Sequence, residues 1–265
     1  MKPQNYRFEH FSLRVMMNDL RFSRQAKQTK QITNCPLSLI NGSETQLYNI
    51  IRDKPLILFT GSLSCPMTMS SLEDMQRISD KFKDKYTVAM LYVREAHPGD
   101  NWPQPSQMAV KRQHALAFAR SNPGQLLVLI DGLEGDLHRQ LDTKPNSLHI
   151  IDPQGQVLFM ALWAGDNKAV VKAIEQLEDG QSPSDVSVSE RMLMPFLRGA
   201  AFMHETLQQA GRRADRELMR GAPPIWLLSR AASVLKFVPH KQRGIVAMVV
   251  LLTLLIVLVA IFIFS

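Results

Sequence analysis

The sequence predicts an α/β domain, followed by a C-terminal helical segment and a single transmembrane helix. Residues 55–59 form a short apolar run that leads through a Gly/Ser turn into a helix beginning near Cys65. Apolar runs at 87–93 and 125–130 alternate with helical patterns, as expected of buried parallel strands. Residues 244–265 carry no charge over a length that crosses the ~30 Å hydrocarbon layer of a membrane.

The helix after Cys65 is predicted over residues 66–85, where Met67, Leu72, Met75, Ile78 and Phe82 recur at helical spacing. Pro66 suits its first turn, which needs no partner for the missing N–H. The remaining predicted elements are a strand at 35–40, a turn at 41–42, a strand or short helix at 45–51, helices at 106–121 and 132–141, strands at 147–151 and 156–162, and a helix around 170–177.

This order, βαβ followed by a β-hairpin and a helix, is typical of a thioredoxin-like fold. Right-handed crossovers place the carboxyl ends of parallel strands at one edge, so Cys65 and the loop at 94–103 should meet there. Pro145 precedes the hairpin, where thioredoxin-like folds usually carry a cis-proline facing the cysteine. A trans proline in a turn is the alternative.

Four regions are predicted along the chain. They are a basic N-terminal extension (1–34), a thioredoxin-like domain (35–180), a linker with basic amphipathic juxtamembrane helices (181–243) and a transmembrane tail anchor (244–265). Phe8, Phe11, Leu13, Val15 and Met16 are the residues of the extension most suited to docking.

The net charge of +7 is uneven, with +5 in residues 1–34, +6 in residues 189–243 and −4 between them. A basic segment beside a membrane span is attracted to anionic lipid headgroups. Nucleic-acid binding is not expected, because no aromatic–basic interleaving accompanies the charge. The stretch 225–237 suits an interfacial amphipathic helix, and packing against the domain is the alternative.

The N-terminal 40 residues lack the apolar region of a signal peptide, and basic residues lie just before the span. We therefore expect a single-pass, tail-anchored protein whose large N-terminal part faces the cytoplasm. Two cysteines, Cys35 and Cys65, suit a reducing compartment. The histidines have no metal-ligand spacing and no phosphate-binding glycine loop is present, so neither a metal nor a bound cofactor is expected.

Cys65 is the candidate nucleophile. A cysteine at a helix N-terminus faces free N–H groups and the positive end of the dipole, which should lower its thiol pKa. Thr68 stands where a CxxC motif would have its second cysteine. Thr68 and Ser62 are expected to donate hydrogen bonds to the sulfur or to a bound oxygen. The alternative is a buried, inert core cysteine.

The loop after the 87–93 strand contains Glu95-Ala96-His97-Pro98, then Asp100 and Trp102. This pattern resembles the iodothyronine deiodinase family, thioredoxin-fold selenoenzymes related to peroxiredoxins. The resemblance covers roughly residues 32–178 and places Cys65 at the selenocysteine. Gln113-His114 and Arg120 resemble the family's Gln-His and following Arg, and 152–161 its terminal hairpin.

The departures are specific. Sulfur replaces selenium, so dehalogenation should be slow at best. Leu63 stands where the family has an extra cysteine, and the family's glycine-rich segment is reduced here to residues 164–165. The family's membrane anchor is N-terminal, whereas the predicted anchor of this chain is C-terminal. The resemblance therefore implies the fold and a thiol chemistry more firmly than a thyroid-hormone substrate.

The resemblance favours catalytic roles for His97, as proton donor, and Glu95, which orients it. The alternatives are a solvated loop residue for His97, and pairing with Arg94 or capping of a helix for Glu95. Trp102, His114, Arg120 and Pro145 are further candidates for substrate binding; packing is the alternative for Trp102, and a place on the helix surface or in the core is the alternative for His114. We expect a membrane-anchored oxidoreductase acting on a peroxide, a disulfide or a halogenated aromatic. An external thiol, glutathione or thioredoxin, regenerates Cys65, unless Cys35 resolves the intermediate. The alternative function is a non-catalytic membrane scaffold on the same fold. A homodimer is compatible with this fold.

Overall fold

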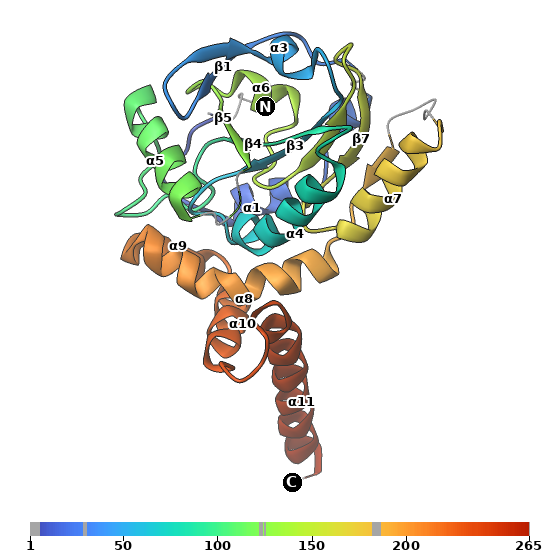
Figure 1. The fold of residues 1–265 in the computed structure, drawn as a ribbon. Coiled ribbons are helices and arrows are strands. Elements are labelled where there is room, and N and C mark those ends of the chain that lie inside the picture. The colour runs from blue at the N-terminus through green and yellow to red at the C-terminus, as the bar shows by residue number, and fades with distance from the viewer. Residues whose placement is uncertain (1–5, 29–30, 122–123, 125, 182–186, 265) are drawn as a thin grey trace.

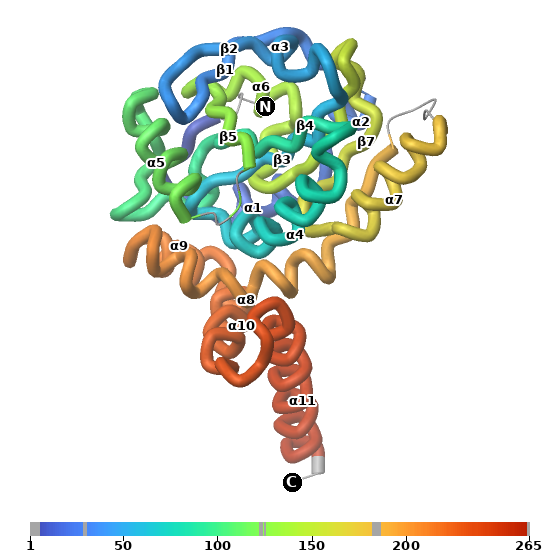
Figure 2. Tube along the Cα trace, viewed as in Figure 1, coloured from blue at the N-terminus to red at the C-terminus, as the bar shows by residue number. Residues whose placement is uncertain are grey.

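The computed structural model describes residues 6–28, 31–121, 124, 126–181 and 187–264. A mixed sheet flanked by helices forms the main body, and further helices connect it to a long terminal helix that projects away from it (Figures 1 and 2). The strands are β1 (Pro36–Leu39), β2 (Glu44–Gln46), β3 (Leu56–Gly61), β4 (Thr87–Tyr92), β5 (Leu127–Ile130), β6 (Leu148–Ile151), β7 (Val157–Ala161) and β8 (Ser187–Ser189).

The helices are α1 (Leu13–Asp19), α2 (Arg24–Gln28), α3 (Leu47–Ile51), α4 (Pro66–Phe82), α5 (Met108–Ser121), α6 (Asp136–Gln140), α7 (Asn167–Glu178), α8 (Leu193–Ala210), α9 (Arg212–Gly221), α10 (Pro223–Val234), the 3-10 turn η1 (His240–Gln242) and α11 (Arg243–Phe264). Helices α4, α5 and α6 lie at the predicted positions with shorter bounds, and α7 extends beyond the predicted 170–177 at both ends. The stretch at 45–51 contains both predicted alternatives, the end of β2 and then α3.

The strand order is β2-β1-β5-β4-β3-β6-β7-β8. Strands β3, β4 and β5 are parallel, whereas β6 is antiparallel to both β3 and β7. A parallel βαβ unit extended by an antiparallel hairpin is the thioredoxin-like arrangement, so the predicted fold is confirmed. The carboxyl ends of β3 and β4 are adjacent, with Gly61 opposite Tyr92.

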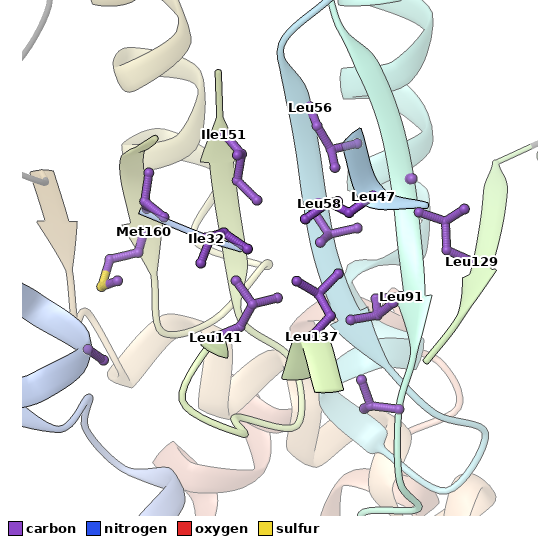
Figure 3. Close-up of a cluster of buried hydrophobic side chains, with 14 of the residues drawn as sticks. Ile32, Leu47, Leu56, Leu58, Leu91, Leu129, Leu137, Leu141, Ile151 and Met160 are labelled. Carbon is purple, nitrogen blue, oxygen red and sulfur yellow. The ribbon is translucent and has the colours of Figure 1, made fainter. Parts of the chain in front are cut away.

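Each central strand buries both faces, because alternate residues enter different apolar clusters. Leu56 and Leu58 of β3 belong to one cluster with Leu137 of α6 (Figure 3). Ile57 and Phe59 enter the other, against α4, α5 and α7. The helices on both faces explain why these strands read as continuous apolar runs.

The N-terminal segment and the segment after α7 both join the main body. Phe11 and Val15 are buried against residues of α8 and α9, which bears out their docking role, whereas Leu13 is exposed. The linker predicted at the start of the 181–243 region is partly wrong, because Ser187–Ser189 pairs in parallel with β7 as an edge strand. Residues 182–186 of that linker lie outside the described residues.

Helix α8 lies between the domain and the remaining C-terminal helices, packing on α4 on one side and on α10 and α11 on the other. In α10, Leu228 and Ala232 are buried in this packing while Leu227 is exposed, so the helix both packs and presents an apolar face to solvent. Among the described residues, one helix, His240–Ile263, is long and apolar enough to cross a membrane, with a mean hydropathy of 3.4.

Candidate active site

The turn between β3 and α4 positions Cys65 as predicted. Cys65 is the N-cap residue of α4, with extended backbone angles, and Pro66 is the first helical residue. The N–H of Cys65 donates to the Ser62 carbonyl at 3.3 Å, which closes the turn, and the Cys65 carbonyl accepts the first helical bond from Met69. The nucleophile candidate thus sits at a helix N-terminus, at the carboxyl edge of the sheet.

Cys65 lines a cavity of about 260 Å³. His97 and Pro145 line the same cavity, so three of the predicted site residues meet at one place. The peptide bond before Pro145 is trans, the alternative that the sequence left open. Apolar side chains make up most of the remaining wall: Phe11, Met16, Leu20, Pro66, Met67, Ala96, Trp163, Met192, Phe196, Met203, Leu218 and Ile225.

The expected low pKa of Cys65 is not found. The side chain is only 2% exposed, and burial raises its pKa to about 11. The Thr68 side chain and the N–H groups of Thr68 and Met67 act in the lowering direction, but burial outweighs them. The helix N-terminus is present as predicted, but burial of Cys65 by the cavity wall outweighs its lowering of the thiol pKa. Cys65 is therefore protonated at neutral pH when no substrate is bound.

His97 is buried beside the cavity. Its backbone N–H donates to Ser64 Oγ at 3.1 Å, and its ring packs on Phe11 with centroids 4.3 Å apart. Burial lowers the pKa of His97 to about 4, so the imidazole is neutral at pH 7. Its Nδ1 has no hydrogen-bond partner among the described residues. At neutral pH His97 is therefore not an imidazolium, and it cannot act as the proton donor that the sequence predicted until it has first accepted a proton.

The sequence predicted that Glu95 orients the imidazole of His97, but the structure gives the Glu95 carboxylate other partners. Its carboxylate accepts hydrogen bonds from Ser64 Oγ (2.6 Å), the Ser64 N–H (3.1 Å) and Tyr92 OH (2.5 Å), and its fourth contact is His114 Nδ1 at 3.0 Å. Burial and the charge of Glu95 raise the pKa of Tyr92 well above its ordinary value, so Tyr92 stays a donor. Glu95 reaches His97 only through the Ser64 hydroxyl.

Of the other predicted site residues, two are packed next to Cys65 and two lie outside the cavity wall. Thr68 and Ser62 are fully buried behind Cys65; Ser62 Oγ accepts from the Ala96 N–H at 3.3 Å and ties the turn to the loop. Trp102 packs edge-on against His114 at 5.1 Å and lies outside the cavity wall. Arg120 is exposed on α5 and does not line the cavity, so its predicted role in substrate binding stays a prediction.

Sequence reasoning missed Asp19, the one carboxylate in the cavity wall. Burial raises its pKa to about 7, although Arg94 and Lys144 act in the lowering direction. It also missed the wall contributed by Met192, Phe196, Met203, Leu218 and Ile225. The apolar spacing of α8 and α10 was a signal that these helices pack on something, but it did not identify the surface.

Cys35 does not line the cavity. Both cysteines are free and buried, and burial, with Asp131 and Asp136 adding to it, raises the pKa of Cys35 to about 12. Within the described ranges, no group of three or more His, Cys, Asp or Glu side chains is arranged to hold a metal ion. The cavity therefore offers one thiol, one neutral imidazole and one carboxyl to a bound molecule.

Comparison with known proteins identifies similar sequences and similar folds. A family model for iodothyronine deiodinase matches residues 5–133. Thyroxine 5-deiodinase of Homo sapiens is 28% identical over 121 residues, which cover 42% of this chain and 40% of the human protein. Type I iodothyronine deiodinase of Xenopus laevis is 20% identical over 182 residues, covering 64% of this chain and 71% of that protein.

Solved structures similar to the chain include a lipoprotein thioredoxin of Streptococcus pneumoniae (TM-score 0.41, 18% identity, covering 54% of this chain and 99% of that one). A thiol-disulfide oxidoreductase of Bacteroides fragilis gives a TM-score of 0.43 at 13% identity, over 56% of this chain and 99% of its own. The matched segment spans less than half of the human deiodinase. The matches to residues 5–133, just under half of the chain, support the resemblance to the iodothyronine deiodinase family that the loop at 94–102 and Cys65 at the start of α4 predicted.

Proposed function

We propose that the protein is a membrane-anchored, thiol-dependent oxidoreductase in which Cys65 is the nucleophile. The observation that carries the proposal is the position of Cys65 at the N-terminus of α4, in the wall of a cavity that His97 and Pro145 also line. A substrate in that cavity contacts the sulfur directly. The similarity to the iodothyronine deiodinases and the thioredoxin-like strand order support redox chemistry at this position.

The chemistry begins with loss of the Cys65 proton. Because burial holds the thiol protonated, a neighbouring base must take the proton as the sulfur attacks. His97 is neutral at pH 7 and lines the same cavity, so it accepts the proton and then delivers it to the leaving group. Attack on a peroxide gives a sulfenic acid at Cys65, and attack on a disulfide gives a mixed disulfide.

An external thiol completes the cycle. Thr68 replaces the second cysteine of a CxxC motif, and Cys35 lies outside the cavity wall. Glutathione or thioredoxin would reduce the oxidised Cys65, with two thiols giving one disulfide. Dehalogenation, the activity named in the relatives, is the less suitable reaction here, because a sulfur nucleophile attacks a carbon–iodine bond more weakly than selenium does.

Membrane anchoring is proposed from helix α11 and the basic residues near its start. The helix His240–Ile263 spans the membrane, and the basic residues before it and in its first turn, Arg230, Lys236, Lys241 and Arg243, lie on the cytoplasmic side. The redox domain then faces the cytoplasm, where external thiols are abundant. The same basic residues attract anionic headgroups.

A second function is favoured by one observation, the raised pKa of Cys65. An inert buried thiol on a redoxin fold is what a membrane-bound scaffold or binding protein would carry. In that case the cavity binds a ligand without reacting with it.

Turnover of a peroxide by the full chain, with glutathione or thioredoxin as reductant, separates the two functions. We expect Cys65→Ser to lower the rate by more than about 10³-fold, as removal of a nucleophile does, and Cys35→Ser to leave it within about twofold. Equal turnover by wild type and Cys65→Ser would reject the proposal. Loss of turnover in Cys35→Ser alone would make Cys35 the resolving cysteine.

A further inference from the structure

The wall of the Cys65 cavity is built in part by the helices that lead to the membrane span. Phe196 and Met203 come from α8, Leu218 from α9 and Ile225 from α10. Helix α8 also packs against α11 through Leu197 and Ala200. A cavity assembled from these helices exists only when the membrane-proximal segment is docked on the domain, so its shape and chemistry belong to the membrane-bound protein.

Two glycines bring the nucleophile's helix and the membrane helix close to α8. A Cβ atom at Gly199 of α8 would lie 2.2 Å from Met67 Sδ at the start of α4. A Cβ atom at Gly244 of α11 would lie 1.8 Å from the carbonyl oxygen of Leu197. The backbone contact at Gly244 requires glycine, whereas the flexible Met67 side chain could move away from a larger residue at position 199. A single helix, α8, therefore separates the start of α4 from the start of the span.

The polar groups around the sulfur are few and incompletely paired. His97 Nδ1 and Trp163 Nε1 are buried and have no hydrogen-bond partner among the described residues, and both residues line the cavity. The Thr68 side chain is engaged with the Cys65 thiol. Buried polar atoms are normally paired, so this set is suited to a ligand that brings a small group able to donate and accept.

The edge of the cavity is apolar as well. Met192 lines the cavity and is 37% exposed, and the next two residues, Leu193 and Met194, are 68% and 45% exposed. An exposed run of large apolar side chains beside an apolar cavity favours a hydrocarbon ligand over a hydrated one. Cys65 itself is 2% exposed, so a molecule that reacts with its sulfur in this state must first enter the cavity.

We infer that the substrate of this site is a hydroperoxide carried on an apolar body, of the class formed in membrane lipids. The inference rests on the proposed function, because it needs Cys65 to be a nucleophile. The hydroperoxide group supplies two oxygens that accept hydrogen bonds and one O–H that donates, which suits the unpaired His97 Nδ1 and the unpaired Trp163 N–H. The hydrocarbon chain occupies the wall formed by α8 and α10.

The reaction balances with a thiol as the reductant. The Cys65 sulfur, its proton taken by His97, attacks the terminal oxygen of the hydroperoxide; an S–O bond forms and the O–O bond breaks. The sulfur is oxidised to a sulfenic acid, and the alkoxide takes the proton and leaves as an alcohol. One external thiol displaces water to form a mixed disulfide, and a second releases its disulfide and restores Cys65.

The test measures sulfenic acid formation at Cys65 in the full chain, reconstituted in phosphatidylcholine nanodiscs, by trapping and mass spectrometry. The probes are hydrogen peroxide, cumene hydroperoxide and a linoleate hydroperoxide. Ile225→Trp narrows the cavity from α10, and Leu227→Trp adds the same ring at a 51% exposed position on that helix, outside the cavity wall. Comparing the two variants with the same probe cancels its partitioning into lipid.

We expect Ile225→Trp to slow the two apolar hydroperoxides by about tenfold or more, the usual effect of an obstructed apolar pocket, and hydrogen peroxide by less than about threefold. Leu227→Trp should behave as wild type. Met203→Trp, which narrows the same cavity from α8, is the second variant if Ile225→Trp does not fold.

Oxidation of Cys65 by all three probes, with Ile225→Trp and Leu227→Trp indistinguishable, would overturn the apolar-substrate inference and leave the proposed function standing. Absence of Cys65 oxidation by any probe would overturn both. Slowing of hydrogen peroxide and the apolar probes by the same factor would also reject the inference, since the cavity would then not discriminate.

Discussion

The two sides of the loop at 94–103 differ in how their polar groups are paired. On one side, Glu95, Ser64, Tyr92 and His114 form a closed network in which every oxygen of the carboxylate has a donor. On the other, His97 faces an apolar cavity with its Nδ1 unpaired. Both histidines are buried; among the described residues, the Nδ1 of His114 has a hydrogen-bond partner and the Nδ1 of His97 has none.

A saturated network has no capacity left for a ligand, so its role is to hold the Cys65 turn against the loop. The unsaturated side keeps free hydrogen-bonding groups that a substrate can satisfy. In this chain the histidine most suited to chemistry is therefore the one that lacks a carboxylate partner. Perturbing each side should have different consequences, stability for the network and rate for the cavity.

The largest effect is expected from Glu95→Ala. The change leaves Ser64, Tyr92 and His114 without their shared acceptor in a fully buried site, which should cost about 3–5 kcal/mol of unfolding free energy. Urea unfolding followed by tryptophan fluorescence measures it. The control is Glu205→Ala at an exposed position on α8, expected to lie within about 0.5 kcal/mol of wild type. A Glu95→Ala protein as stable as this control would mean that the network does not hold the turn.

The paired and unpaired histidines provide a direct contrast. His114→Asn should lower the unfolding free energy by about 1–3 kcal/mol, because it removes a buried hydrogen bond to a carboxylate. His97→Asn should cost less stability and slow peroxide oxidation of Cys65 by about 10²-fold, the usual share of a general acid–base group. Both quantities are measured on the same samples. A His97→Asn protein that loses stability but keeps its rate would reverse the two roles.

These contrasts also show what the sequence made predictable. Cys65 at a helix start and the sheet order follow from local apolar periodicity and the Gly/Ser turn, which are properties of contiguous residues. The pairing of Glu95 with His114 depends on how α5 lies over β4 and its loop. Spacing along the chain placed Glu95 near His97 instead, two residues away.

The pKa of Cys65 was missed for a related reason. The favourable helix N-terminus is encoded within four residues, whereas the burial that opposes it comes from side chains such as Phe11 and Phe196, far away in the sequence. Apolar periodicity showed that α8 and α10 must pack on a surface but not which one. Arg120 was assigned to the site by resemblance alone, and the structure leaves it exposed.

Acid stability should separate the buried histidines by their surroundings. Burial lowers the pKa of His97 to about 4 and that of His149 to about 3, so each favours the folded state above its unfolded pKa of about 6.5. This stability is lost as the pH falls from about 6.5 toward those values, at up to about 1.4 kcal/mol per pH unit for each histidine. Melting temperatures between pH 7.5 and 4.5 should therefore fall less steeply for His97→Gln than for wild type. Parallel curves would show that His97 protonates freely in the folded state.

The smallest effect is expected from Asp19→Asn, in the wall of the cavity. Its pKa of about 7 means that Asp19 becomes charged as the pH rises through neutrality, and that charge raises the pKa of Cys65. Removing it should move the iodoacetamide-labelling midpoint of Cys65 to lower pH and raise the rate a few-fold above pH 8, with no change below pH 6, as a screened interaction of ~1 kcal/mol would.

The direction of the Asp19→Asn effect also decides which cavity group takes the thiol proton. If His97 is the base, neutralising Asp19 removes an unfavourable charge and the peroxide reaction becomes faster at alkaline pH. If Asp19 is the base, the reaction of Asp19→Asn becomes slower wherever the wild-type carboxylate is ionised, although the labelling midpoint still moves down. Opposite changes in labelling and in peroxide rate would therefore assign the proton transfer to Asp19 and leave His97 as a hydrogen-bond donor to the substrate.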